Sequence, residues 1–222
     1  MVATLVEKNI TSLKRAIELR GHASWAVSGG STPLPLFETM SAADLPWSKV
    51  SVALVDERWV PINHARSNTA FVKSRLLKGN AKDATFVPIR DDANAGNCSA
   101  DFANEQYATL SLPFDRILLG MGGDGHAASL FPEAEGLEEA MAADNDAICA
   151  TIRAKKSDIT GDELERITLT AAEICRATTI DLMITGEDKM RVFKEAMDCE
   201  SNYPIGRLMK MAPEKFEIYW AP

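Results

Sequence analysis

The sequence predicts one α/β domain in which helices cover both faces of a mostly parallel sheet, a Rossmann-like three-layer arrangement. Short apolar runs alternate with longer amphipathic stretches along all 222 residues, and this alternation is typical of successive strand–helix units. No linker rich in proline, glycine or serine divides the chain. We therefore expect a single domain that spans residues 1–222.

The apolar runs predict the strands, and the amphipathic stretches predict the helices. Strands are expected at residues 25–27, 50–55, 114–119, 147–152, 166–170, 180–184 and 216–220. Helices are expected at residues 5–19, 33–40, 68–77, 97–110 and 189–197, with one more from residue 171. Gly21 is suited to end the first helix, and Ser67 or Asn68 is suited to cap the third. The polar segment 89–96 predicts a surface loop.

The chain is acidic, with a formal net charge of −8 at pH 7. This charge argues against a nucleic-acid or anionic-membrane partner, since both require a basic surface. The N-terminus is charged and amphipathic, unlike a secretory signal, and no apolar run approaches the ~20 residues that a membrane helix needs. No two cysteines form a CxxC pair, so we expect a cytoplasmic protein with reduced thiols at Cys98, Cys149, Cys175 and Cys199.

Unusual polar and glycine-rich residues follow four of the predicted strands. In an open parallel sheet, ligands bind at the carboxyl ends of the strands, so we expect these four clusters to meet at one edge. They are Ser28-Gly-Gly-Ser-Thr-Pro33, Asp56-Glu-Arg-Trp-Val-Pro61, Gly120-Met-Gly-Gly-Asp-Gly-His126 and Thr185-Gly-Glu-Asp-Lys189. Any anionic ligand would be held there by local donors against the acidic net charge.

The first cluster suits an oxyanion such as a phosphate. Gly29 and Gly30 let the backbone turn tightly and expose its N–H groups, while Ser31 and Thr32 add hydroxyl donors. The helix expected from Pro33 points its positive dipole end toward the same place. The alternative is an ordinary strand-to-helix turn with a Ser or Thr cap.

The second and fourth clusters supply charged side chains. Asp56 is a candidate to orient a sugar hydroxyl or to act as a base, and Arg58 is a candidate to contact a carboxylate, a phosphate or a developing oxyanion. The alternative is a surface ion pair of little consequence. Lys189, at the start of a predicted helix, is a candidate phosphate ligand, although a solvated lysine is the ordinary alternative.

The third cluster contains the principal catalytic candidate, His126. Histidine is the natural general base at neutral pH, and the neighbouring glycines let the chain fold around a small ligand. Residues 120–125 also satisfy the GxGxxG pattern of dinucleotide-binding folds. We reject that interpretation because the match follows the third strand, because Asp124 and His126 lie inside the turn, and because Pro132 limits any helix opening from it.

The sequence contains no other recognised nucleophile or metal pattern. Ala26 occupies the first glycine position of GxSxG around Ser28, and there is no GxxxxGK[ST] phosphate loop. The three histidines are widely separated and offer no HExxH pair, so no catalytic zinc and no cofactor are expected. We expect His22 and His64 to be surface residues, and the alternative for His126 is a purely structural histidine.

Taken in order along the chain, these motifs resemble the 6-phosphogluconolactonase family. The resemblance rests on the clusters at 28–33, 56–61 and 184–189, on Ser67-Asn68, on Leu119-Gly-Met-Gly-Gly-Asp-Gly-His-Ala-Ala-Ser-Leu-Phe-Pro132 and on Arg166-Ile-Thr-Leu-Thr170. It implies the fold shared with glucosamine-6-phosphate deaminases. It also implies hydrolysis of 6-phospho-D-glucono-1,5-lactone to 6-phosphogluconate, a step of the oxidative pentose phosphate pathway.

The resemblance implies that His126 activates the attacking water. We expect Asp124 or Asp56 to hold the imidazole or a sugar hydroxyl. The enzymatic alternative is an amino-sugar-phosphate deaminase or isomerase. Deaminases resemble the third motif but carry, five residues after the histidine, a glutamate that helps it to open the sugar ring. Phe131 occupies that position here and cannot relay a proton.

The resemblance also implies that Lys189 and the turn at 29–32 bind phosphate and that Arg58 and Arg166 contact the substrate. The expected partner is a small sugar-phosphate lactone, and the expected assembly is a monomer or weak homodimer. The non-enzymatic alternative is a sugar-phosphate-sensing module of a transcriptional regulator. Such a regulator needs a DNA-binding appendage, for which the strand–helix pattern leaves little room.

Overall fold

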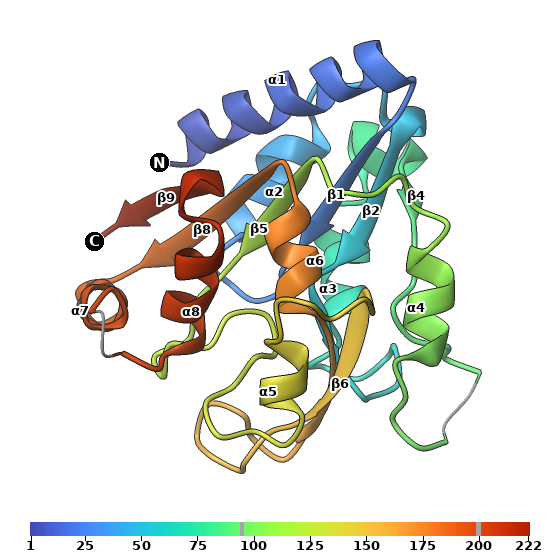
Figure 1. Ribbon diagram of the computed structural model, residues 1–222. Helices are drawn as coiled ribbons and strands as arrows, with labels where there is room; N and C mark the ends of the chain where they lie inside the picture. Colours follow the sequence, from blue (N-terminus) through green and yellow to red (C-terminus); the bar gives the residue numbers. More distant parts are fainter. Residues whose placement is uncertain (94–95, 199–200) are drawn as a thin grey trace.

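The computed structural model describes residues 1–93, 96–198 and 201–222, and it confirms the predicted α/β class (Figure 1). Within these residues, six parallel strands form the central sheet in the order β4-β2-β1-β5-β8-β9. Their bounds are Ala23–Val27 (β1), Val50–Leu54 (β2), Thr85–Phe86 (β4), Arg116–Leu119 (β5), Thr179–Thr185 (β8) and Phe216–Ala221 (β9). Because all six run the same way, their carboxyl ends meet at one edge.

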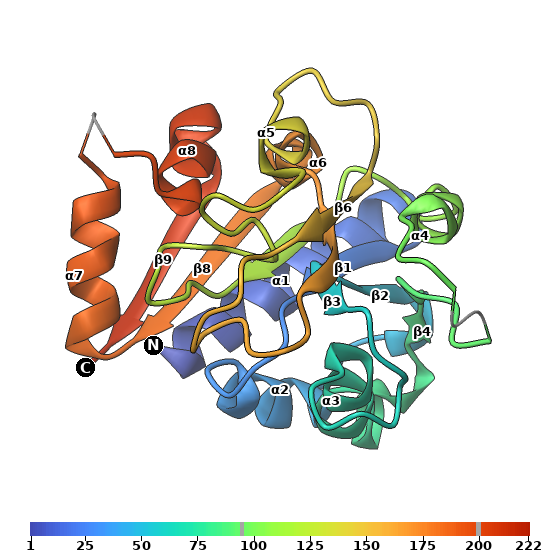
Figure 2. The same cartoon turned by 90° about the horizontal axis from the view of Figure 1, so that it is seen from below.

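Helices cover both faces of this sheet, which crosses the molecule between two helical layers in Figure 2. They are α1 (Val2–Arg20), α2 (Leu34–Ser41), α3 (Asn68–Arg75), α4 (Asp101–Tyr107), α5 (Leu137–Ala140), α6 (Ala171–Arg176), α7 (Glu187–Ala196) and α8 (Pro204–Met211), with 3-10 turns at Trp47–Lys49, Gly79–Asp83 and Pro213–Lys215. On one face α1 packs on β1 and α2, and α2 packs on α3. On the other face α8 packs on α6 and α7.

The described residues also form a second, antiparallel sheet, which we did not predict. Its order is β3 (Asp56–Arg58), β7 (Glu165–Leu169) and β6 (Cys149–Arg153). Val55 joins the two sheets, because its N–H donates to Val27 O at 3.1 Å while its own O accepts the Leu169 N–H at 2.8 Å. Residues 56–58, which follow the end of the strand predicted at 50–55, therefore form a strand of their own, and Arg58 stands opposite Arg166 in the register.

Several predicted elements have shifted ends. The helix expected at 97–110 begins at Asp101, where Ser99 Oγ accepts the Asp101 N–H at 3.1 Å. The strand expected from residue 147 begins at Cys149, since Asn145 Oδ1 holds the Ala147 N–H in a turn at 2.9 Å. The short elements β4, α5 and α8 are absent from the prediction.

Two predicted helix ends are confirmed. Gly21 ends α1 with a φ of 84°, and its N–H donates to Ile17 O. Ser67, and not Asn68, caps α3 by accepting the Ala70 N–H at 3.1 Å. In the segment expected to be a surface loop, Ile89 and Arg90 are buried, while Asn94 lies outside the described residues.

The described cysteines Cys98, Cys149 and Cys175 are free thiols, and Cys199 lies outside the described residues. Among the helices that the structure describes, none is long and apolar enough to cross a membrane.

A buried charge cluster lies within the core near the amino ends of the strands. Asp181 of β8 accepts hydrogen bonds from both Nε (2.9 Å) and Nη2 of Arg116, the first residue of β5. Asn9 of α1 donates to the same carboxylate at 3.3 Å. Burial raises the pKa of Asp181, and the contacts with Arg116 oppose this increase. The cluster fastens α1 to the sheet at the edge remote from the predicted site.

Candidate active site

Segments that are far apart in the sequence line one pocket of about 370 Å³ at the carboxyl edge of the sheet. The lining draws on all four predicted clusters and on β7, and it includes Gly29, Gly30, Ser31, Thr32, Asp56, Arg58, His126, Arg166 and Lys189. Asp124 is the one predicted site residue outside the lining, and it contacts His126 directly. The expected convergence of the clusters is therefore confirmed.

His126 and Asp124 form a hydrogen-bonded pair. His126 Nδ1 lies 2.5 Å from Asp124 Oδ1, and the same oxygen accepts the His126 backbone N–H at 3.2 Å. Burial raises the pKa of Asp124, but the hydrogen bond and charge of His126 outweigh this effect and leave the pKa below its usual value. An ionised carboxylate only accepts, so in the neutral imidazole Nδ1 carries the proton and Nε2 keeps its lone pair.

The glycines of the third cluster bring the backbone against the imidazole. The Gly122 N–H donates to His126 O at 2.9 Å, and the Gly125 N–H donates to Gly122 O at 3.1 Å. A Cβ at Gly122 would stand 2.1 and 2.2 Å from His126 ring atoms and 2.6 Å from Asp124 Oδ1. Gly125 has a φ of 75°, and a Cβ there would meet the Tyr203 ring at 2.4 Å. Packing of the histidine turn thus accounts for these glycines without a dinucleotide.

The first cluster forms a tight turn beside the pocket. Gly30 has a φ of 93°, a conformation that favours glycine. A Cβ at Gly29 would stand 2.1 Å from Asn68 Oδ1, so only glycine leaves room for that side chain. Ser31 and Thr32 line the pocket immediately before α2. This arrangement offers hydroxyl and backbone donors to an anion.

Lys189 adds a positive charge from the first turn of α7. Burial lowers the pKa of Lys189, and attraction to the Asp124 carboxylate partly opposes this decrease. Among the described residues, Lys189 has no hydrogen bond or ion pair of its own. Its ammonium group is therefore available to a ligand in the pocket.

Asp56 has partners other than the imidazole. Its Oδ2 accepts from Ser129 Oγ at 2.6 Å, and its Oδ1 accepts from Asn68 Nδ2 at 3.2 Å. These contacts tie β3 to the segment that follows His126 and to the start of α3. Of the two carboxylates that the sequence left open, Asp124 is the one that holds the imidazole. Sequence reasoning missed Ser129, whose partner lies 73 positions away.

Arg66 is a second residue that sequence reasoning missed. It lines the pocket beside Arg58 and Arg166, and its Nη1 donates to Glu163 Oε2 at 2.5 Å. Nothing in its local sequence distinguishes it from a surface arginine. It becomes part of the site only because the turn before α3 lies against the loop between β6 and β7.

Phe131 lies between the histidine and one of the arginines. Its ring centroid is 4.2 Å from that of His126 and 5.7 Å from Arg166 Cζ. The phenyl ring is buried and forms one wall of the pocket. It supplies an apolar surface at the position where a deaminase would need a proton carrier.

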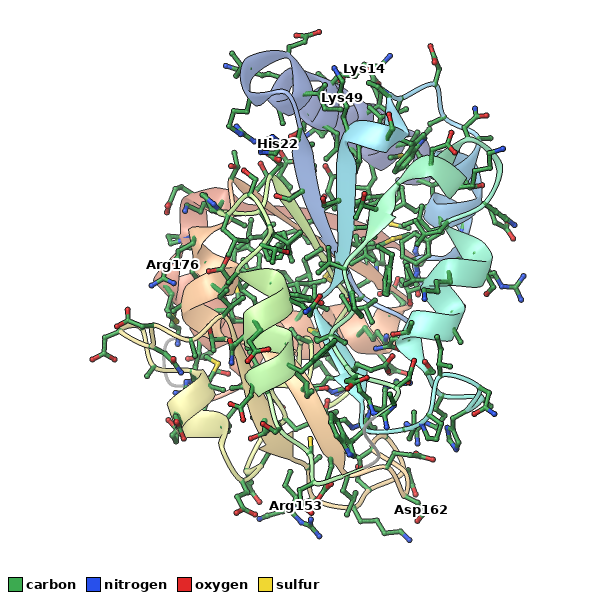
Figure 3. The ribbon with its side chains drawn as sticks, turned by 90° about the vertical axis from the view of Figure 1, so that its right-hand side faces the viewer. Lys14, His22, Lys49, Arg153, Asp162 and Arg176 are labelled. Carbon is green, nitrogen blue, oxygen red and sulfur yellow. The ribbon has the colours of Figure 1, made fainter. Side chains whose placement is uncertain are left out.

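The other two histidines lie at the surface, as predicted, with His22 exposed and His64 half-buried. His22 lies with Lys14 and Lys49 at the end of the molecule opposite Arg153 and Asp162 in Figure 3. His64 lies 3.8 Å from Glu163 and is outside the pocket lining. Within residues 1–93, 96–198 and 201–222, no group of three or more His, Cys, Asp or Glu side chains is arranged to hold a metal.

The fold and the pocket together define an α/β enzyme whose cationic pocket is lined by a histidine bonded to a neighbouring carboxylate. Comparison with known proteins identifies the family. Residues 1–220 match the model of the glucosamine-6-phosphate isomerases/6-phosphogluconolactonase family, and the chain belongs to that family.

Individual relatives agree with this assignment. A 6-phosphogluconolactonase of Mesorhizobium japonicum is 41% identical over 210 residues, which are 95% of this chain and 86% of that protein. One of Pseudomonas aeruginosa is 35% identical over 212 residues, with coverage of 95% and 86%. The crystal structure of a 6-phosphogluconolactonase from Shewanella baltica has a TM-score of 0.88 and 34% identity, and the match covers 100% of this chain and 93% of that one.

Proposed function

We propose that this chain hydrolyses 6-phospho-D-glucono-1,5-lactone to 6-phosphogluconate. The observation that carries the proposal is that His126, which is paired with Asp124, lines the same pocket as the 29–32 turn and Lys189. An imidazole held by a carboxylate is suited to proton transfer, and the turn and lysine are suited to a phosphate. The names of the relatives point to the same reaction.

His126 acts as the general base in this proposal. Because ionised Asp124 accepts the Nδ1 proton, Nε2 removes a proton from water as that water attacks the lactone carbonyl. The same nitrogen then returns a proton to the ring oxygen as the C1–O bond breaks. The lactone is an activated ester, so one base and correct positioning suffice without a covalent intermediate.

The remaining polar residues position the substrate. The 29–32 turn and Lys189 bind the phosphate, which fixes the lactone relative to His126. Arg58 lies in the same pocket with a free Nε–H and stabilises the oxyanion that develops on the carbonyl oxygen. Asp56, held by Ser129 and Asn68, orients a sugar hydroxyl.

The enzymatic alternative is the deamination of an amino-sugar phosphate. Phe131 argues against it, because a phenyl ring packed against His126 cannot carry the proton that ring opening requires. Ammonia release from glucosamine 6-phosphate would favour this alternative. Tight binding of 6-phosphogluconate without lactone turnover would favour the sensing module instead.

Replacing His126 by alanine tests the proposal. In a coupled assay with freshly generated lactone, corrected for spontaneous hydrolysis, kcat should fall by about 10²- to 10⁴-fold with little change in KM. His22→Ala is the matched control, since His22 is exposed and lies at the opposite end of the molecule from the β6–β7 loop. Turnover of the His126 variant within a few-fold of the control would refute the assignment.

The proposal includes a cytoplasmic location and a small-molecule substrate as the partner. The free thiols of the described cysteines support a reducing compartment. We expect a monomer or weak homodimer, which light scattering on the purified protein measures.

A further inference from the structure

The turn that carries His126 has little side-chain support of its own. Four of the six residues at 120–125 are glycine, the residue that loses most conformational freedom when it is fixed in a fold. The hydrogen bonds from Gly122 to His126 and from Gly125 to Gly122 close the turn on itself. They do not attach it to the rest of the protein. The position of the imidazole therefore depends on what packs against the turn from outside.

Tyr203 packs against this turn at Gly125. A Cβ at Gly125 would stand 2.4 Å from Cδ1, 2.8 Å from Cγ and 3.0 Å from Cβ of Tyr203, so the tyrosine lies directly on the glycine backbone. The Ile205 N–H, two residues further along, donates to Gly125 O at 3.1 Å. Gly122 and His126 line the active-site pocket, whereas Gly125 and Tyr203 lie outside its lining. Tyr203 therefore supports the turn from outside the pocket.

The support is itself held in place, because Tyr203 immediately precedes α8. Pro204 is the first residue of that helix, and its fixed φ suits the start of a helix. A Cβ at Gly206 would stand 2.1 Å from Ala196 O, so α8 packs backbone to backbone against the end of α7. The two helices lie side by side in Figures 1 and 2. Tyr203 thus extends from a fixed helix start to a turn made largely of glycine.

The same pair of helices connects two chemical groups of the site. Lys189 lies in the first turn of α7, and Ala196 at the end of α7 packs against Gly206 of α8. Packing is therefore continuous from Lys189 through α7 and α8 to Tyr203 and Gly125. A reaction between oriented groups needs the base to be fixed relative to the part of the substrate that is bound. These contacts fix the turn of His126 relative to the lysine.

We propose that Tyr203 is a positioning residue for the hydrolysis and that its ring holds His126 in place relative to the bound phosphate. It acts through Gly125 and touches neither the substrate nor the reacting atoms. The inference rests on the proposed function and adds to it a residue outside the pocket. Without the ring, the glycine turn relaxes into the space that the ring leaves, and the imidazole moves away from the attacking water.

Two substitutions of Tyr203 separate the ring from its hydroxyl in the coupled lactone assay. Tyr203→Ala should lower kcat by about 10- to 100-fold with little change in KM, since a misplacement of up to about 1 Å costs as much as about 10²-fold. Tyr203→Phe keeps the ring and should restore kcat to within about threefold of the wild type. It removes only a hydroxyl whose contact with Glu195 Oε2 is long, at 3.5 Å, and exposed.

Leu208→Ala is the matched control for a loss of packing on the same helix. Leu208 is fully buried and lies where Cys175 of α6 contacts α8. Its truncation should lower the midpoint of urea unfolding and leave kcat within about threefold of the wild type. If Tyr203→Ala behaved in the same way, with lower stability and an unchanged kcat, the role of Tyr203 would be structural only and the proposal would be overturned. An equal loss of kcat in Tyr203→Phe and Tyr203→Ala would also overturn it, because the hydroxyl would then be the group required.

Amide hydrogen exchange supplies a second measurement that needs no turnover. In Tyr203→Ala the amides of Gly122 and Gly125, which close the turn, should exchange about tenfold faster than in the wild type, while those of β1 and β5 keep their wild-type rates. If Tyr203→Ala does not fold, Tyr203→Leu gives the same comparison, since leucine covers the helix start but has no flat ring to lie on Gly125. Unchanged exchange of both amides would overturn the role of Tyr203 and leave the proposed hydrolysis intact. A wild type that does not hydrolyse the lactone would refute only the proposed hydrolysis, because the exchange rates still decide whether Tyr203 holds the turn.

Discussion

Replacing Gly122 by alanine tests whether the placement of the imidazole limits the rate. The new Cβ would stand 2.1 and 2.2 Å from two His126 ring atoms and 2.6 Å from Asp124 Oδ1. Non-bonded carbon atoms approach no closer than about 3.5 Å without repulsion, so the ring has to move by roughly 1 Å or more. The backbone cannot yield easily, because the Gly122 N–H is bonded to His126 O.

The size of that movement sets the expected loss of activity. A misplacement of about 1 Å lowers the rate of an oriented reaction by about 10²-fold. We therefore expect kcat of Gly122→Ala to fall by about 100-fold. KM should change little, since the 29–32 turn and Lys189 remain in place. The coupled lactone assay, corrected for spontaneous hydrolysis, measures both quantities.

Gly123→Ala is the matched control for this experiment. It introduces the same methyl group one residue further along, where a Cβ meets nothing within 4 Å and φ is not positive. Its kcat should stay within about threefold of the wild type. If Gly122→Ala also stayed within that range while remaining folded, the close contact of glycine with the imidazole would not control catalysis.

Three further substitutions probe charge in the site and in the core. Asp124→Asn should lower kcat by about 10²-fold with little change in KM, because the imidazole loses the carboxylate that accepts its Nδ1 proton; an unchanged kcat in the coupled assay would show that Asp124 does not act through His126. Since the pKa of Asp124 is lowered in the folded protein, the stability that the pair contributes is present above the usual Asp pKa and is lost as the pH falls through the lowered value. Lys189→Met should raise KM about 10- to 100-fold with kcat nearly unchanged, and an unaltered KM in steady-state assays would remove Lys189 from the phosphate site. Asp181→Asn should lower the free energy of unfolding by about 3–5 kcal/mol, because it leaves Arg116 buried without its main partner. Denaturant titration measures this loss. A loss below about 1 kcal/mol would mean that Glu217, 3.3 Å from Arg116, takes the place of Asp181 as the counter-ion.

The parallel sheet and most of the pocket follow from local sequence patterns. Alternating apolar runs and amphipathic stretches predict the strand–helix units, and the rule that parallel strands share a carboxyl edge brings His126 and the 29–32 turn together. Neither of these two inferences requires knowing which side chains are in contact in the folded protein. The short antiparallel sheet is different, because three residues at 56–58 carry no strand pattern of their own. Pairing with β7, more than 100 residues further along the chain, makes them a strand.

The same limit explains why Arg66 and Ser129 were missed. Each contributes through a partner that is distant in the sequence, Glu163 for Arg66 and Asp56 for Ser129. No periodicity or spacing reports such a contact. The opposed pair of Arg58 and Arg166 belongs to the same class, since its like charges become neighbours only when β3 and β7 align. Sequence patterns therefore predict where a site forms better than how its charges are paired.

Strand geometry explains how Asp56, Glu57 and Arg58 serve two purposes within three residues. Successive side chains of a strand point to opposite faces, so Asp56 and Arg58 line the pocket while Glu57 points away from it. The buried Glu57 carboxylate accepts the N–H groups of Asn68 and Thr69 at the start of α3 and that of Arg58.

Burial raises the pKa of Glu57, and these hydrogen bonds oppose the increase. Their geometry fixes β3 against α3, and with it the distance between Asn68 and the turn at Gly29. Glu57, which points away from the pocket, thus fixes the positions of Asp56 and Arg58, which line it.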